Sequence, residues 1–350
     1  VSNENPQINI FFNCNDIYNN LESTCYIYLA MTYYTLPKLF KYTHYNIVQY
    51  IQILLRNDVN SYVTEPLLEK LLDTLITDTN KTQYEEMKSK HSFTNLLNLK
   101  ISDEIYHPKS YFAFIEINKI CRIFSHESMV SMHMSEKYDY LDGLFQIRSC
   151  EDKFIYVNDD NNATAIMPDY VEVANTENIE AVVDKYASTI DLICLNYDNM
   201  KHILKFFLLS LLFQKPGGNM IIKMKRLQNH VSKEMIYLLM SLYDNVLIIK
   251  PKIVNSVNEY KYIVATKYNY SVSKYRNFIV RLFNIITSLN ESNSIDRFLK
   301  IDVPQVLINK IDECELIMSE NTLNTHMKIL NSIHVNNINL KSLEKKQEYF

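Results

Sequence analysis

Glycine is nearly absent from this sequence. Its 350 residues contain three glycines, of which Gly143 stands alone and Gly217 and Gly218 are adjacent. Loops that bind phosphates or dinucleotides need several glycines, because their backbone approaches the ligand closely and adopts positive φ angles. The sequence therefore excludes a P-loop and a GxGxxG loop, together with the nucleotide-binding enzymes that are built on them.

Long apolar runs and clustered cysteines are also missing. No run approaches the roughly 20 apolar residues of a membrane-spanning helix, so no membrane contact is predicted. The six cysteines are scattered without a CxxC pair, which predicts no disulfide framework and no metal site and favours a reducing, cytoplasmic compartment. The chain begins at Val1 and shows no signal peptide.

Charge of either sign is not in large excess. The formal net charge is −4, and 47% of the residues are hydrophobic. These values fit a globular protein and exclude a wholly disordered chain. A general polyanion-binding protein would be more basic, so any contact with nucleic acid must depend on a local cluster of basic residues.

The hydrophobic pattern changes along the chain. Residues 1–90 are mostly helical by spacing, including a helix over 45–55 and an apolar stripe over 65–76. From residue 100 onward, short β-branched or aromatic runs alternate with segments of helical length. The predicted strands cover 111–117, 153–157, 169–173, 190–195, 220–224, 246–249 and 260–266. The predicted helices between them cover 176–186, 202–213 and 233–242.

This alternation predicts an α/β fold with a mostly parallel sheet. The run 190–195 is almost wholly apolar, as in a strand buried on both faces. The last two strands are joined by a loop too short for a crossover helix, so we expect them to be antiparallel. Residues 271–350 return to a helical pattern, with helices predicted over 275–289 and 303–332. The predicted regions are an N-terminal helical region over 1–95, an α/β domain over 96–270 and a C-terminal helical extension over 271–350.

The segment from Asp191 to Lys267 carries a series of motifs in a fixed order. A strand ending in Leu-Ile-Cys-Leu-Asn196 is followed by Pro216-Gly-Gly-Asn-Met-Ile-Ile-Lys223, by Lys250-Pro251, and by Asn258-Glu-Tyr-Lys-Tyr-Ile-Val264. In order, spacing and predicted elements, these motifs resemble the second half of the FtsJ-type ribose 2′-O-methyltransferases. The resemblance is to FtsJ-like proteins of large cytoplasmic DNA viruses, and with Leu99-Lys100-Ile-Ser-Asp-Glu-Ile105 and residues 169–186 it covers residues 100–267.

The resemblance implies a Rossmann-like methyltransferase sheet, the cofactor S-adenosylmethionine, and a set of polar residues for methyl transfer to a ribose 2′-OH. By motif position the central lysine is Lys223 and the glutamate is Glu259. The other lysine is Lys100, and the aspartate position falls on Asn196. In such a set a lysine deprotonates or orients the 2′-OH and the other groups hold it, because the reaction depends on positioning and electrostatics.

Two departures from the family pattern bear on activity. Asn196 lacks the charge of an aspartate, which Asp198 would supply if the chain stayed extended and pointed it to the same side. The predicted first strand, 111–117, is followed by a segment without glycine, where the family has a glycine-rich cofactor loop. The cofactor contacts expected at the predicted strands 111–117 and 190–195 are Glu116, Asn118, Lys119 and Asp191.

A cluster of basic residues is predicted at one edge of the sheet, near Lys223. Its candidate RNA contacts are Lys225, Arg226, Lys250 and Lys252. Such lysines can equally be solvated surface side chains, and Lys223 can extend its charge from a strand end into water. Glu259 can form a surface pair with Lys261, and Asn196 can be an ordinary turn residue after a strand.

Two functions fit these residues. In the first, the chain is a catalytically inactive FtsJ-like protein that serves as a structural or stimulatory subunit in viral mRNA capping or RNA processing. It would then resemble the poxvirus mRNA-capping small subunits and bind another capping or transcription protein. In the second, it is an active S-adenosylmethionine-dependent mRNA cap ribose 2′-O-methyltransferase that uses Lys100, Asp198, Lys223 and Glu259. The missing glycine loop and Asn196 favour the first function.

Overall fold

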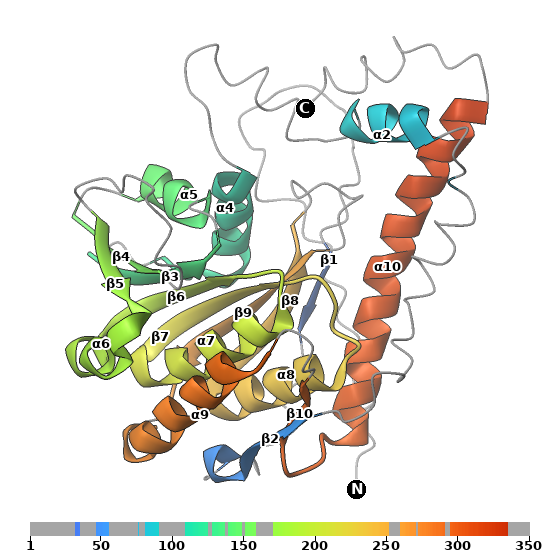
Figure 1. The fold of residues 1–350 in the computed structure, drawn as a ribbon. Helices are drawn as coiled ribbons and strands as arrows, with labels where there is room; N and C mark the ends of the chain where they lie inside the picture. Colours follow the sequence, from blue (N-terminus) through green and yellow to red (C-terminus); the bar gives the residue numbers. More distant parts are fainter. Residues whose placement is uncertain are drawn as a thin grey trace, which may run out of the picture.

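The fold is built around one eight-stranded sheet (Figure 1). The computed structural model describes residues 32–35, 47–55, 76, 81–90, 109–124, 128–136, 139–148, 151–158, 171–251, 260–270, 272–290 and 295–334. The strands of the sheet are β1 (Thr32–Thr35), β3 (Val130–Ser135), β4 (Lys153–Asn158), β5 (Val171–Asn175), β6 (Ile190–Asn196), β7 (Gln214–Met224), β8 (Tyr243–Lys250) and β9 (Lys261–Tyr268). Their order across the sheet is β1-β8-β9-β7-β6-β3-β4-β5.

Strands β5, β4, β3, β6 and β7 are parallel to their neighbours. Strand β9 lies between β7 and β8 and is antiparallel to both, as the short connection between β8 and β9 predicted. Because β3, β6, β7 and β8 run in the same direction, their C-terminal residues lie along one side of the sheet. We call this side the carboxyl edge and the opposite side the amino edge.

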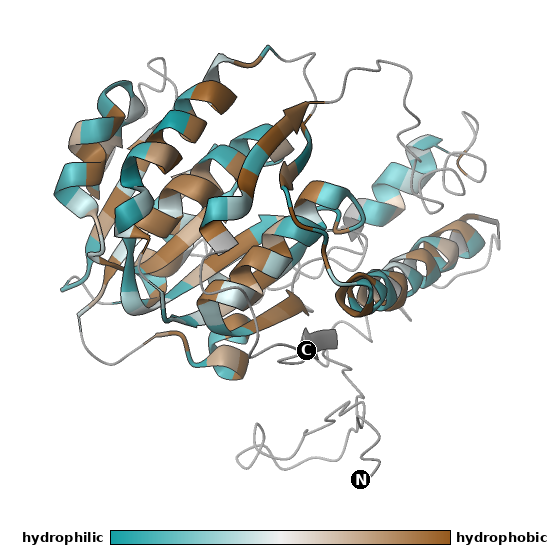
Figure 2. Cartoon of the chain, turned by 90° about the horizontal axis from the view of Figure 1, so that it is seen from below, coloured by the Kyte–Doolittle hydropathy of each residue, from teal (hydrophilic) through white to brown (hydrophobic). Residues whose placement is uncertain are grey.

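Helices cover both faces of the sheet, which confirms the α/β class and gives a Rossmann-like arrangement (Figure 1). Helices α4 (Lys109–Cys121) and α5 (Asp139–Ile147) lie on one face, here called the α4 face. Helices α6 (Ile179–Tyr186), α7 (Met200–Phe213), α8 (His230–Leu242) and α9 (Arg276–Ser288) lie on the other, the α7 face. The central strands are mainly hydrophobic, as two covered faces require (Figure 2).

The prediction of a strand over 111–117 is wrong, because these residues belong to helix α4. Ala113, Phe114 and Ile117 are fully buried at helical spacing in the core cluster of the α4 face. A short apolar run with two buried sides does not distinguish a strand from a helix. The first strand of the parallel sheet is instead β3, whose sequence VSMHMS gave no β-branched run.

The remaining predictions for 153–289 are confirmed with shifted ends. The strand predicted over 190–195 is β6, which lies between β3 and β7 and is buried on both faces. The helix predicted from Thr176 begins as a short 3-10 turn, Thr176–Asn178, and continues as α6. The side chain of Asn178, rather than that of Thr176, caps α6 by accepting a hydrogen bond from the Ala181 N–H.

Parts of the N-terminal region form strands and not the predicted helices. Strand β1 extends the sheet by pairing with β8. The helix predicted over 45–55 is wrong: a 3-10 turn over Ile47–Tyr50 leads into β2 (Ile51–Leu55), which pairs with β10 (Ile295–Leu299). The tertiary partner of β2 decides this case, because an apolar pattern of this length fits both states. Of the stripe predicted over 65–76, the structure describes Ile76, which packs against the cluster of Tyr84, Ile329 and Leu330.

The C-terminal extension is attached through buried polar contacts. Helix α10 (Gln305–His334) runs along one side of the molecule and reaches α2 (Lys81–Lys90), far from it in sequence (Figure 1). The buried carboxylate of Glu234 on α8 accepts hydrogen bonds from Arg297 Nε at 2.8 Å and from the Phe298 N–H at 2.7 Å. These bonds fix β10 against α8. Among the helices of the described part, none is long and apolar enough to cross a membrane.

Candidate functional site

Asn196 and Lys223 lie next to each other at the carboxyl edge. Leu195 of β6 pairs with Ile222 of β7, and the next residues along these two parallel strands are Asn196 and Lys223. Alternation places both side chains on the α4 face, because Cys194 and Ile221, two residues earlier, belong to the core cluster of that face. The structure thus brings together two of the predicted catalytic positions.

The Lys223 side chain contacts the aromatic ring of Tyr260, the residue directly before β9. The Lys223 ammonium nitrogen lies 4.1 Å from the centroid of the Tyr260 ring. Tyr260, Tyr262 and Val264 follow at two-residue steps, and Tyr262 and Val264 are buried in the core cluster of the α4 face. Residue 260 therefore lies on the face of Lys223, and the same alternation in the sequence could have identified it. Glu259, which motif position assigned to this role, lies outside the described residues.

Asp198 does not take the place of the missing aspartate. The idea required the chain to stay extended after Asn196, but β6 ends at Asn196 and the chain bends at Asp198. Between them, Tyr197 is buried against Phe206, with ring centroids 5.0 Å apart. Asp198 is exposed, and Asn199 caps α7 by accepting a hydrogen bond from the Lys201 N–H.

The sheet has a topological switch point between β3 and β6. The chain leaves β3 towards β4 on one side and leaves β6 towards β7 on the other, and ligands of such sheets bind outside the carboxyl ends at this point. Here Glu136 N–H donates a 3.4 Å hydrogen bond to the carbonyl of Asn196. The carbonyl of Ser135 accepts a 2.6 Å hydrogen bond from the Tyr156 hydroxyl. Backbone groups at the switch point are therefore engaged within the protein.

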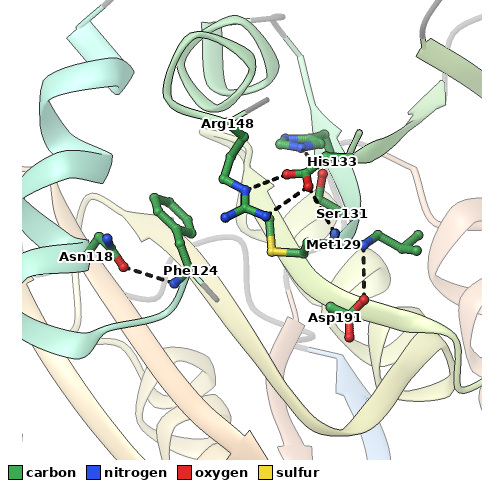
Figure 3. Close-up of polar contacts among 9 residues, drawn as sticks. Asn118, Phe124, Met129, Ser131, His133, Arg148 and Asp191 are labelled. Atoms are coloured by element: carbon green, nitrogen blue, oxygen red, sulfur yellow. Dashed lines mark hydrogen bonds and ion pairs between the residues drawn. The ribbon is translucent and has the colours of Figure 1, made fainter. Parts of the chain in front are cut away.

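The predicted cofactor residues Glu116, Asn118 and Lys119 do not follow a strand, since all three are in helix α4. The Asn118 side chain accepts a 2.9 Å hydrogen bond from the Phe124 N–H and so closes the end of the helix (Figure 3). Glu116 is buried and Lys119 is exposed. After α4, the Ile123 carbonyl accepts a hydrogen bond from Asn219, which lies in the amino half of β7. The strand on which these assignments rest is therefore wrong, and the end of α4 lies away from the carboxyl edge.

Asp191 also lies at the amino edge, where β6 begins. Its carboxylate accepts a 3.0 Å hydrogen bond from the Val130 N–H (Figure 3). It also forms a 2.9 Å ion pair with Lys215. The adjacent glycines of the motif stand beside it. A Cβ atom on Gly218 would lie 2.9 Å from the Asp191 carbonyl oxygen, and Gly217 has a φ of +82°. Asp191 and the glycine pair thus serve the close approach of β6 and β7.

The predicted RNA contacts that the structure describes differ in their surroundings. Lys225 is exposed just after β7, and Arg226 is half-buried beside it. Lys250 instead donates a hydrogen bond to the Thr322 hydroxyl of α10. Lys261, on the strand next to that of Lys250, was not among the predicted RNA contacts. It is buried and forms a 2.7 Å ion pair with Glu315 of α10.

Three predicted site residues, Lys100, Lys252 and Glu259, lie outside the described residues. Within the part of the chain that is described, no group of three or more His, Cys, Asp or Glu side chains is arranged to hold a metal ion. His133 of β3 is buried on the α4 face, where its Nε2 lies 3.1 Å from the Ser131 hydroxyl (Figure 3). Burial lowers the pKa of His133 to about 3, so this imidazole is neutral at physiological pH.

A groove of about 490 Å³ lies between α6 and α9 on the α7 face. Its lining includes Glu180, Arg276, Val280 and Asn284. Arg276 forms a 2.5 Å ion pair with Asp184 of α6. None of the predicted site residues lines this groove, which is on the opposite face from Lys223.

The sequence of the domain matches one known family. Residues 115–268 match the FtsJ-like methyltransferase family. These residues form an FtsJ-like methyltransferase domain. The FtsJ-like domain begins within α4 and ends with β9, so it contains the carboxyl edge with Asn196, Lys223 and Tyr260. No curated protein matches the chain.

Several solved structures match parts of the chain at low similarity. The MycE methyltransferase of mycinamycin biosynthesis, in complex with Mg and SAH, is 9% identical with a TM-score of 0.33 and covers 45% of this chain and 47% of its own. The O-methyltransferase from Bacillus cereus in complex with SAH is 12% identical with a TM-score of 0.33, and the match covers 57% of this chain and 96% of that enzyme. The fibrillarin pre-rRNA processing protein of Methanococcus jannaschii is 9% identical with a TM-score of 0.30, and the match covers 41% of this chain and 68% of that protein. This chain therefore spans about half of the length of MycE.

Proposed function

We propose that the FtsJ-like domain does not transfer methyl groups and that the protein is a structural or stimulatory subunit of a viral mRNA-capping or RNA-processing assembly. The observation that carries the proposal is that backbone groups at the switch point between β3 and β6 are hydrogen-bonded within the protein. The Glu136 N–H donates to the Asn196 carbonyl, and the Ser135 carbonyl accepts from the Tyr156 hydroxyl, at the edge where ligands of such sheets bind.

The connection after β3 gives the same indication. Strand β3 ends at Ser135 and α5 begins at Asp139, and the three residues between them include no glycine. A loop that surrounds a cofactor with its backbone needs residues without a Cβ atom and with positive φ angles. The residues at this position therefore do not fit S-adenosylmethionine.

The polar residues at the carboxyl edge are also poorly suited to proton abstraction. The Lys223 ammonium lies over the ring of Tyr260, the residue directly before β9. A lysine that acts as a base needs neighbours that let it lose its proton. An aromatic face instead favours the charged ammonium.

A role as a subunit is supported by where apolar side chains are exposed. Of the seven large hydrophobic residues that are exposed in the described part, six lie in the N- and C-terminal extensions. They include Val306 and Leu316 on α10, and Leu316 is 70% exposed. Exposed apolar residues on an added helix favour contact with another protein, such as a second capping or transcription protein.

An active cap ribose 2′-O-methyltransferase is the alternative, and the position of Lys223 favours it. The lysine stands at the carboxyl edge beside Asn196, where a reacting group of this fold belongs. In that case Lys223 would orient the ribose hydroxyl, with Lys100 and Glu259 completing the set. The two functions differ in whether the chain binds S-adenosylmethionine.

Calorimetric titration of S-adenosylmethionine into the full chain tests the proposal. We expect no binding heat at about 1 mM cofactor, and no ligand-dependent rise of Tm, which bound ligand would cause by mass action. Transfer of a labelled methyl group to capped RNA is measured in the same preparation. Micromolar binding, or transfer that Lys223→Ala abolishes, would overturn the inactive function.

Matched variants locate any binding that is found. Glu136→Ala changes an exposed charge at the carboxyl end of β3, and Lys119→Ala changes an exposed charge on α4. If a cofactor binds at the switch point, only Glu136→Ala affects its affinity. If Lys119→Ala alone affects it, the site is on α4 and the topological argument is wrong.

A further inference from the structure

The groove between α6 and α9 has a basic and apolar wall on the side of α9. Arg281 and Ile285 line this wall one helical turn apart, and both are exposed. Helix α9 carries two arginines and no acidic residue. Its other arginine, Arg276, forms the ion pair with Asp184 of α6. Arg281 therefore presents a positive charge to solvent next to an exposed apolar side chain.

The groove is large enough for side chains of another helix. Its volume of about 490 Å³ is within the range of sites that hold small molecules. An amphipathic helix binds in such a groove with residues that are three or four positions apart on one face. The α6 side adds the carboxylate of Glu180 to the lining, so the charge match must be made to α9. A matching helix has an apolar side chain and a negative charge one turn apart.

Helix α10 carries this pattern on its exposed side. Leu316 is the most exposed large hydrophobic residue of the described part. Glu320, four residues later, is exposed on the same side of the helix. The stretch over 311–327 contains four acidic residues and no lysine or arginine. The exposed apolar side chain of α10 thus stands in an acidic segment, whereas that of α9 stands in a basic one.

The two patterns match when the helices lie antiparallel. In α9, Arg281 precedes Ile285 by four positions. In α10, the acidic residue instead follows the apolar residue by four positions. Four residues span about 6 Å along any α-helix. An antiparallel arrangement therefore brings Leu316 onto Ile285 and Glu320 beside Arg281 at the same time, whereas a parallel arrangement satisfies one of the two pairs.

The two surfaces belong to separate parts of one molecule. Helix α9 and the middle of α10 lie apart from each other (Figure 1). Ion pairs of Glu315 and Asp312 hold this part of α10 against β9 and α8. A contact between the two surfaces therefore joins two copies of the chain.

We propose that this chain self-associates head to tail, with α10 of one copy lying in the groove between α6 and α9 of another copy. Leu316 of one copy packs on Ile285 of the other, and Glu320 forms an ion pair with Arg281. Because the two surfaces differ, the contact is heterologous, and an open pair of copies keeps one unused surface of each kind.

The inference goes beyond the proposed function. None of the predicted site residues takes part, so the contact forms whether or not the domain transfers methyl groups. Leu54, Leu55 and Val306 are also exposed and are not part of the contact. They are left for a capping or transcription protein.

Sedimentation velocity of the full chain at about 5 to 200 µM measures the association, because an interface made by one helix is small and weak. We expect the weight-average mass of wild type to rise with concentration. Leu316→Lys and Ile285→Glu should each weaken association at least about 10-fold, because each places a charge in an apolar contact. Val306→Lys makes the same kind of change elsewhere on α10 and is the matched control, which should associate as wild type does. Thermal melts confirm that each variant is folded.

Mixing two variants tests the head-to-tail geometry. Leu316→Lys keeps an intact groove, and Ile285→Glu keeps an intact α10 surface. An equimolar mixture should therefore form dimers at concentrations where neither variant associates alone. A mixture that stays monomeric overturns the proposal. Association of Ile285→Glu alone at the level of wild type also overturns it, because α10 would then contact something other than the groove.

Charge exchange tests the second pair of residues. Arg281→Glu and Glu320→Arg should each weaken association about fivefold or more at low salt, since an exposed ion pair contributes up to about 1 kcal/mol. The double variant joins opposite charges again and should associate as wild type does. A double variant that is as weak as the single variants overturns the antiparallel arrangement. Wild type that stays monomeric over the whole concentration range overturns self-association and leaves the exposed side of α10 to a different protein.

Discussion

The ion pair between Lys261 and Glu315 holds α10 to the sheet, and removing one partner should destabilise the protein strongly. The Lys261 ammonium lies 2.7 Å from the Glu315 carboxylate, and the side chains are only 2% and 7% exposed. The further hydrogen bond of Lys261, to the Lys225 carbonyl at 3.3 Å, is weak. Glu315→Ala would therefore leave a buried charge with little compensation.

We expect Glu315→Ala to lower the free energy of unfolding by about 3–5 kcal/mol, the usual cost of breaking a buried ion pair. The double variant Lys261→Met with Glu315→Leu removes both charges and keeps the volume, so it should be about as stable as wild type. The matched control is Asp312→Ala. It breaks the 2.7 Å pair between Lys233 and Asp312, whose carboxylate is 47% exposed, and should cost about 1 kcal/mol or less.

Urea denaturation of the four proteins measures these differences, followed by circular dichroism and by hydrogen exchange in α10. Exchange should rise first in the α10 segment of Glu315→Ala, because that helix loses its buried contact. If Glu315→Ala and Asp312→Ala shift the midpoint equally, or if the double variant is as unstable as Glu315→Ala, the buried pair does not anchor α10 and the reasoning is wrong.

Three further predictions concern other parts of the fold. Gly143→Ala should lower stability by about 1–3 kcal/mol in urea denaturation, because its Cβ would lie 2.7 Å from the Tyr111 nitrogen where α5 meets α4. Burial raises the pKa of Glu172, but hydrogen bonds from Lys153, Lys185 and Tyr186 outweigh it and lower the pKa to about 2. Its stabilisation is thus complete above the unfolded-state pKa of 4.5 and is lost as pH falls towards 2, so the Tm difference between wild type and Glu172→Gln should shrink on acidification. His133 has a pKa of about 3 when folded and 6.5 when unfolded, so wild type should lose stability as pH falls below 6.5. His133→Met should remove that part of the pH dependence of Tm, and an unchanged dependence would contradict the burial of His133 as a neutral group.

The middle of the sheet was predictable because its strands are buried on both faces. The run around Leu192 and Leu195 in β6 is nearly continuous and apolar, and no amphipathic helix has that pattern. The antiparallel position of β9 followed from the length of its connection alone. Strand β3 escaped detection because Ser131, His133 and Ser135 fill one of its faces with buried polar groups.

The candidate site was predicted in part. Lys223 and Asn196 were placed correctly at strand ends, since motif order and strand length fix their positions along the chain. Tyr260 was missed in favour of Glu259, although alternation from Tyr262 identifies it. The cofactor assignments at 116–119 were based on a predicted strand, whereas these residues belong to helix α4.

The sequence by itself determined the class of this fold and the absence of a glycine loop. Both follow from local quantities, the period of apolar residues and the count of glycines, which do not change with tertiary contacts. Only the tertiary structure decided at which edge each polar residue stands: Asp191 at the amino edge, Lys223 at the carboxyl edge, Lys250 against α10. The edge depends on strand direction and order, and these arise from packing between segments that are far apart in the chain.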